Sequence, residues 1–257
     1  MDTEIAEARP GQQRTAARSV TPRRPRWWQR PWIAPLMVGS VAFLAFSLPP
    51  YLTFDPAQSR LPLREGFAPH YPMLVAHILF GTVALLTCCL QVWPWFRQRH
   101  PVAHRIVGRV YVFAGMIPTA LTGLVVALAA VTSGVAGKVG NSLLVVVWVA
   151  VTFAGFRAAR QRRFGEHRRW MIRGFALMTS IVVNRLWVVL CIAALQPFAA
   201  TYFGGDEVAM NQAAVDTAIW LSWVVNLLIA EWWLERRKKP RGGAPAANRR
   251  SAVAASA

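Results

Sequence analysis

The chain has 257 residues, of which 55% are apolar and only 16% are charged, and it contains 12 Trp. A soluble chain of this length would hold about two domains, with its apolar residues spread at amphipathic spacing. Here the apolar residues fall in blocks of roughly 17 to 25, the helix length that crosses a hydrocarbon core of about 30 Å. The composition therefore excludes an ordinary soluble protein and predicts an all-α, polytopic transmembrane helical bundle.

The formal net charge of +18 indicates orientation in the membrane, because the basic residues are divided unequally between alternate segments. The two tails and the segments 97–109 and 157–173 hold 25 Lys and Arg residues, against 3 in the other loops. The positive-inside rule then predicts an even number of spans with both termini in the cytoplasm, and no nucleic-acid partner. Arg outnumbers Lys 26 to 3, which is typical of a GC-rich bacterial genome and favours the bacterial inner (plasma) membrane.

Six apolar blocks are predicted to span the membrane. In chain order they cover residues 32–48, 71–93, 106–131, 139–156, 171–195 and 213–234. The first block resembles the apolar core of a signal peptide but lacks a small-residue cleavage site, so we interpret it as an uncleaved anchor. Spans two to five are expected to form a four-helix core.

The predicted membrane domain covers residues 32–236, with its core at 71–197. Residues 1–31 are basic and residues 237–257 are of low complexity, so both are expected to be disordered cytoplasmic tails. The loop 55–69 is predicted to lie outside.

Two ionisable residues stand at membrane depth, where each is costly unless it is paired or faces a polar cavity. His77 lies about 9 Å inside the outer end of span two, and Arg185 lies at a similar outer depth in span five. With Asn184 they are expected to form an outward-facing ligand-binding cluster, because imidazole and amide groups can accept from the guanidinium. The alternative is that Arg185 snorkels to the outer head groups while His77 bonds a neighbouring helix.

A second candidate site lies at the cytoplasmic end. His104 and His167 each open a helix beside an Arg, namely Arg105 and Arg168. Two facing imidazoles are a plausible axial pair for the iron of haem b, and the arginines would suit an anionic lipid head group. The alternative is that each His-Arg pair only anchors its span in the head-group layer.

Small residues recur at helical spacing on two spans. On span two they accompany His77 at Gly81, Ala84 and Cys88, and on span three they accompany His104 at Gly108 and Gly115, together with Tyr111. Such stripes allow close helix packing, the commoner cause, or the approach of a flat cofactor.

These residues resemble a known family. The stretches from His77 to Gln91, from Arg99 to Tyr111 and from His167 to Trp187 are similar to the bacterial membrane family called domain of unknown function 2306. The resemblance covers about half of the chain and implies a helical membrane core, without an established activity. Comparison with four-helix cytochromes b is an analogy only, since the two histidines that those proteins carry on one helix are absent.

The sequence alone therefore leaves the function open between three classes. We expect a non-catalytic or accessory membrane protein that binds a lipid, quinone or similar ligand between spans two and five. A haem b-carrying electron-transfer protein is the first alternative, and a small-solute or proton transporter is the second. The interiors of spans two to five hold no Asp or Glu, which disfavours a proton relay.

Overall fold

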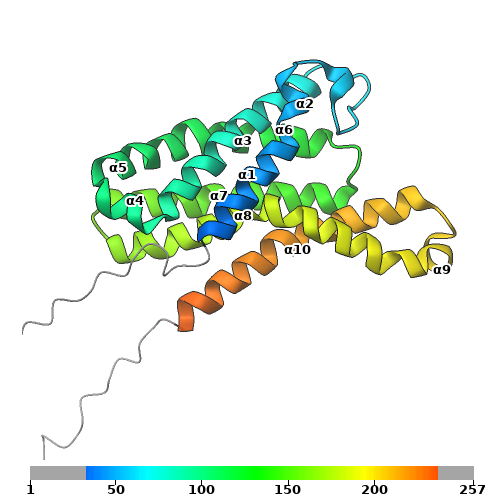
Figure 1. Cartoon of the computed structure of the whole chain (residues 1–257). Coiled ribbons are helices and arrows are strands. Elements are labelled where there is room, and N and C mark those ends of the chain that lie inside the picture. Colours follow the sequence, from blue (N-terminus) through cyan, green and yellow to red (C-terminus); the bar gives the residue numbers. More distant parts are fainter. Residues whose placement is uncertain (1–32, 237–257) are drawn as a thin grey trace, which may run out of the picture.

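The computed structural model describes residues 33–236, and every regular element in that range is a helix (Figure 1). In chain order the elements are α1 (Ile33–Ser47), α2 (Pro49–Leu52), the 3-10 turn η2 (Pro56–Gln58), α3 (His70–Val92), α4 (Pro94–Arg99), α5 (Pro101–Val110), the π-helical turn η3 (Tyr111–Met116), α6 (Ile117–Ala129), α7 (Val135–Arg160), α8 (Phe164–Leu195), the 3-10 turn η4 (Gln196–Phe198), α9 (Ala199–Phe203) and α10 (Glu207–Arg236). The two predicted tails lie outside the described residues.

Five of these helical stretches are long and apolar enough to cross a membrane. They are His70–Val92, Pro101–Ala129, Val135–Arg160, Phe164–Phe203 and Glu207–Arg236. They correspond to the second to sixth predicted spans, so the expectation of an all-α transmembrane bundle is confirmed.

The first predicted span differs from the other five. Its described part, α1, has 15 residues, or about 22 Å of helix, and it bends into α2 at Pro49 and Pro50. Ser40 of α1 lies beside Cys89, near the end of α3, whereas Tyr51 of α2 packs against Leu74, near the start of α3. The bent α1–α2 segment thus runs antiparallel to α3 over most of its depth (Figure 1).

Four of the helical stretches form a ring, as predicted for spans two to five. α3 packs against the continuous helix made by α5, η3 and α6, which packs against α7; α7 packs against α8, and α8 returns to α3. α10 crosses α8 outside this ring and also contacts α7 (Figure 1). The buried centre of the bundle is formed by Ala84, Leu85, Cys88, Cys89, Tyr111, Val112, Met116, Trp148, Val151, Leu177, Met178 and Trp223.

The predicted small-residue stripes meet at the interface between α3 and the α5–η3–α6 helix. A Cβ atom placed on Gly115 would lie only 2.9 Å from the Cα of Ala84, and one on Gly81 would lie 3.8 Å from the Thr119 methyl group. Lipid tails give helices no hydrophobic drive to associate, so such close backbone approach is a main source of helix packing in a bilayer. The stripes therefore serve helix packing.

Tyr111 also meets α3 at that interface, where its phenol is near enough to Cys88 to interact electrostatically. It is 5% exposed, and its hydroxyl accepts a hydrogen bond of 3.1 Å from the indole of Trp148 on α7. Tyr111 also begins the π-helical turn η3, which interrupts the helix between α5 and α6. The stripe predicted on this helix nevertheless continues through the π-helical turn, since Gly108 faces Gln91 and Gly115 faces Ala84, both on α3.

A second close contact joins α7 to α10 near the start of α7. The N–H of Gly134 donates a 3.0 Å hydrogen bond to Asp216 on α10, and the Trp220 indole donates one of 3.1 Å to the Ala136 carbonyl. Gly140 faces the same indole, since a Cβ there would lie 3.0 Å from it. The Asp216 carboxylate thus satisfies a free N–H at the positive end of the α7 dipole.

Candidate functional site

We name the two ends of the bundle by their predicted orientation. The outer end carries the loop 53–69 and the start of α7, and the cytoplasmic end carries the turn 161–163.

His77 lies within the α3–α6 interface near the outer end. Its Nδ1 is 3.0 Å from the carbonyl oxygen of Thr119, and its ring fills the space beside Gly123, where a Cβ would lie 2.7 Å from the imidazole. A backbone carbonyl can only accept, so Nδ1 carries the proton in this contact and Nε2 is left as the acceptor.

Asn184 and Arg185 lie on α8, and the structure joins neither of them to His77 by a hydrogen bond. Arg185 is exposed on the bundle surface, and no hydrogen bond or ion pair connects it to any residue in the range 33–236. The phenol of Tyr51 is near enough to interact with it electrostatically. The guanidinium thus retains all five of its donors for another group.

Three further polar side chains lie at the outer end, Tyr51 and two associated with it, and the sequence did not single them out. Tyr51 is only 4% exposed, Tyr71 packs against it, and Ser47 precedes it by four residues. The hydroxyls of Tyr71 and Ser47 are buried, and neither finds a hydrogen-bond partner among the described residues. We call Ser47, Tyr51, Tyr71 and Arg185 the outer polar cluster.

The outer polar cluster can donate hydrogen bonds but offers no formal negative charge of its own. One guanidinium and three hydroxyls are donors that suit carbonyl, ester or phosphate oxygens. Sequence reasoning missed the hydroxyls because Ser and Tyr at a span boundary are ordinary interfacial residues, and nothing in their spacing indicates a shared site.

At the cytoplasmic end, His104 on α5 and His167 on α8 come from opposite helices of the four-helix ring. The His167 Nδ1 is 2.9 Å from the carbonyl oxygen of Gly155 on α7, which leaves its Nε2 as the acceptor. The Nδ1 of His104 is buried and has no hydrogen-bond partner among the described residues. The two imidazoles are close enough for their charges to interact.

Two glycines that follow these histidines on their helices, Gly108 and Gly174, both face side chains. Gly108 lies against Gln91, because a Cβ placed on Gly108 would lie 3.5 Å from the Gln91 Oε1. The Gln91 amide also donates a 2.8 Å hydrogen bond to the His104 carbonyl. Gly174 lies against Thr152, at 3.6 Å from its hydroxyl oxygen. The positions of these two glycines therefore supply no open slot beside the imidazoles.

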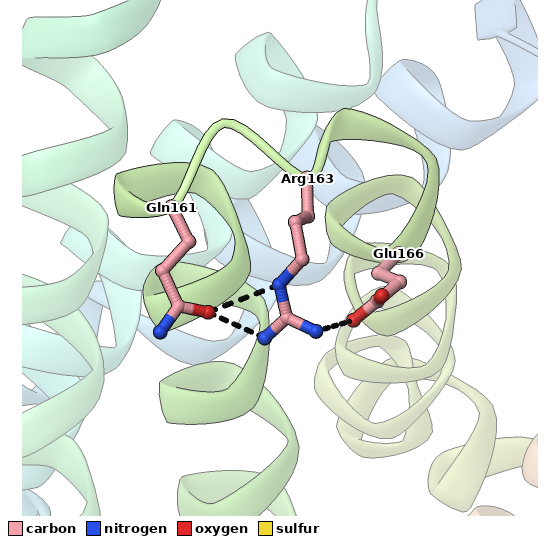
Figure 2. A network of polar contacts seen from close by, with 3 residues as sticks. All are labelled: Gln161, Arg163 and Glu166. Atoms are coloured by element: carbon pink, nitrogen blue, oxygen red, sulfur yellow. Dashed lines mark hydrogen bonds and ion pairs between the residues drawn. The ribbon is translucent and has the colours of Figure 1, made fainter.

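The arginines flanking the two histidines point outward. Arg105 and Arg168 are both exposed, and Arg168 lies 5.9 Å above the ring of Trp233 on α10. The turn before His167 is fixed by Arg163, which donates to Gln161 and forms a 2.6 Å ion pair with Glu166 (Figure 2). This end therefore presents a basic surface above a pair of half-buried imidazoles.

Comparison with known proteins gives one match. Residues 74–234, well over half of the chain, match the family described as "Predicted membrane protein (DUF2306)". No curated protein and no solved structure matches the chain. The matched range contains the whole four-helix ring, apart from the first turn of α3, together with most of α10.

Proposed function

We propose that this chain, which belongs to the "Predicted membrane protein (DUF2306)" family, binds a lipophilic ligand with a hydrogen-bond-accepting head inside the bilayer. A quinone or a lipid meets that description, and the outer polar cluster is the proposed site, with Asn184 beside it and His77 behind it on α3. The protein needs no catalytic group for this role. It would act as a binding or accessory membrane protein.

One observation carries this proposal. Arg185 stands at membrane depth and makes no hydrogen bond or ion pair with any described residue. A guanidinium cannot be deprotonated in proteins, and leaving it unpaired in hydrocarbon costs at least about 2.5 kcal/mol. A ligand oxygen at Arg185 would remove that cost and would also give the Tyr71 and Ser47 hydroxyls an acceptor.

The test uses two probes, decylubiquinone and dioctanoyl phosphatidylglycerol, added to the full-length protein in detergent. A bound ligand raises the melting temperature in a concentration-dependent way. We expect at least one probe to do so in the wild type and the same probe to have no effect on Arg185→Gln. Arg109→Gln, an exposed arginine on α5, is the matched control and should behave as the wild type. Absence of a shift with both probes would refute the proposal.

A second candidate function, haem b-carrying electron transfer, is favoured by the two imidazoles from opposite helices of the ring. The Nδ1 N–H of His167 donates a hydrogen bond to the Gly155 carbonyl. Such a hydrogen bond at Nδ1 usually orients an imidazole that binds a metal through Nε2. His104 and His167 would hold the iron, which would supply one-electron chemistry. A Soret band that is lost in both His104→Ala and His167→Ala would establish this function, and a colourless protein expressed with haem available would exclude it.

The proposed location is the bacterial inner membrane, with both termini cytoplasmic. The unequal distribution of Lys and Arg supports this orientation, and the depth that α1 shares with α3 supports an even number of crossings. Alkaline phosphatase fused after Arg64 should be active, and the same enzyme fused after Lys239 should be inactive. Activity of the second fusion would overturn the span count.

A further inference from the structure

A cavity of about 560 Å³ opens at the outer end, between the loop residues 64–67 and the last turns of α6. Val125, Leu128 and Ala129 form its apolar wall, and Arg64 and Glu65 stand on the loop side. This volume lies in the range of about 300 to 1,000 Å³ that small-molecule sites occupy. None of these residues belongs to the outer polar cluster, so the cavity is a separate feature.

The loop wall of the cavity is held in place. The backbone N–H of Arg64 donates a 2.9 Å hydrogen bond to Nδ1 of His70, which is 3% exposed, and the His70 N–H bonds the Phe67 carbonyl at 3.0 Å. Gly66 adopts φ +71°, a left-handed conformation that glycine takes without strain. The two charged side chains are therefore carried by a fixed turn.

The cavity is bordered by both positive and negative charge. The side chains of Arg64 and Glu65 are exposed, and neither makes a hydrogen bond or ion pair with another residue in the range 33–236. The negative end of the α6 dipole also points here, since α6 ends at Ala129 beside the cavity. The site thus offers one cationic group, the Arg64 guanidinium. It also offers two features that attract a cation, the Glu65 carboxylate and the C-terminal end of α6, next to an apolar wall.

We propose that this cavity binds a zwitterionic phospholipid of the ethanolamine type. The phosphate would pair with the guanidinium of Arg64, and the ammonium group would lie between Glu65 and the end of α6. An acyl chain would run along Val125 and Leu128. This inference goes beyond the proposed function, because it concerns a different site and a ligand that must carry both charges.

The experiment counts bound lipid by native mass spectrometry on the full-length protein, titrated with dioleoyl phosphatidylethanolamine or dioleoyl phosphatidylglycerol. The two lipids share the phosphate and the chains, and only the first carries an ammonium group. We expect the wild type to prefer the ethanolamine lipid about threefold, the size of an exposed charge pair. Glu65→Gln should remove this preference, whereas Arg64→Gln should weaken the binding of both lipids.

Two tryptophan variants test whether the cavity itself is the site. Leu128→Trp should fill the cavity and abolish the ethanolamine preference, and Leu121→Trp is the matched control, since Leu121 is exposed on the same helix outside the cavity. Arg185→Gln should leave the ethanolamine preference intact, which separates this result from the outer polar cluster. Equal binding of both lipids by the wild type, or an unchanged ethanolamine preference in Leu128→Trp, would overturn the proposal.

Discussion

The ion pair between Arg173 on α8 and Glu231 on α10 is predicted to stabilise the packing of these two helices. Arg173 donates to both carboxylate oxygens, with 2.9 Å between Nη2 and Oε2, and its guanidinium also lies 4.8 Å from the ring of Trp170. The side chains are 18% and 38% exposed, so the pair stands between a surface contact and a buried one. A surface pair contributes about 0 to 1 kcal/mol, and breaking a buried pair costs about 3 to 5 kcal/mol.

We therefore expect Glu231→Ala to lower the free energy of unfolding by about 2 kcal/mol, since Arg173 is left with one charge partner fewer. Equilibrium unfolding in mixed detergent micelles would measure this change. In a double-mutant cycle with Arg173→Ala, the coupling should be at least about 1 kcal/mol.

The neighbouring pair provides the control for that cycle. Arg169 and Glu235 lie 3.7 Å apart with side chains 41% and 53% exposed, so we expect their coupling to stay below about 0.5 kcal/mol. Strictly additive effects of Arg173→Ala and Glu231→Ala would refute the reasoning, because a bidentate ion pair at this exposure should give a measurable coupling free energy.

Two further substitutions test the close helix contacts by the same unfolding assay. Gly115→Ala should cost about 1 to 3 kcal/mol, because its methyl group would meet the α3 backbone at 2.9 Å, whereas Gly81→Ala has 3.8 Å of clearance and should be neutral or stabilising. Equal effects of the two changes would contradict the packing described for α3 and α6. Asp216→Ala should cost about 1 kcal/mol through loss of the acceptor at Gly134, and Asp216→Asn should recover most of that loss. If Asn proves no better than Ala, the hydrogen bond to Gly134 is not what stabilises the start of α7.

The spans and the small-residue interfaces could be predicted because they depend on local composition and helical periodicity. Block length alone indicates which segments cross the bilayer. The stripes containing Gly81 and Gly115 follow from a spacing of 3.6 residues, and they do pack against each other. The expected stripe also holds across the π-helical turn that begins with Tyr111, because Gly108 before the turn and Gly115 within it both face α3.

The direction in which a membrane residue faces could not be predicted. The rise of 1.5 Å per residue fixes depth, which is why His77 and Arg185 are expected at one level. The neighbour that each side chain meets depends on which helices are adjacent, and His77 faces Thr119 of α6. Their shared ligand site remains a proposal.

The polar contacts of α10 also could not be predicted from the sequence. Arg173 and Glu231 are 58 residues apart, and Gly134 and Asp216 are 82 residues apart. No local pattern joins such partners, because their pairing requires the tertiary packing of α10 on α7 and α8. Both acidic residues lie on α10, outside the four-helix ring whose spans hold no Asp or Glu in their interiors.

The measurement that tests the central claim most directly is mass spectrometry of the molecules that co-purify with the protein. Wild type, Arg185→Gln and the control Arg109→Gln would be purified in parallel from the same host membranes and extracted with organic solvent. The account predicts a lipophilic molecule with a carbonyl or phosphate head that is retained by wild type and control but reduced about tenfold in Arg185→Gln, equivalent to about 1.4 kcal/mol of binding. Identical extracts from all three proteins would contradict it.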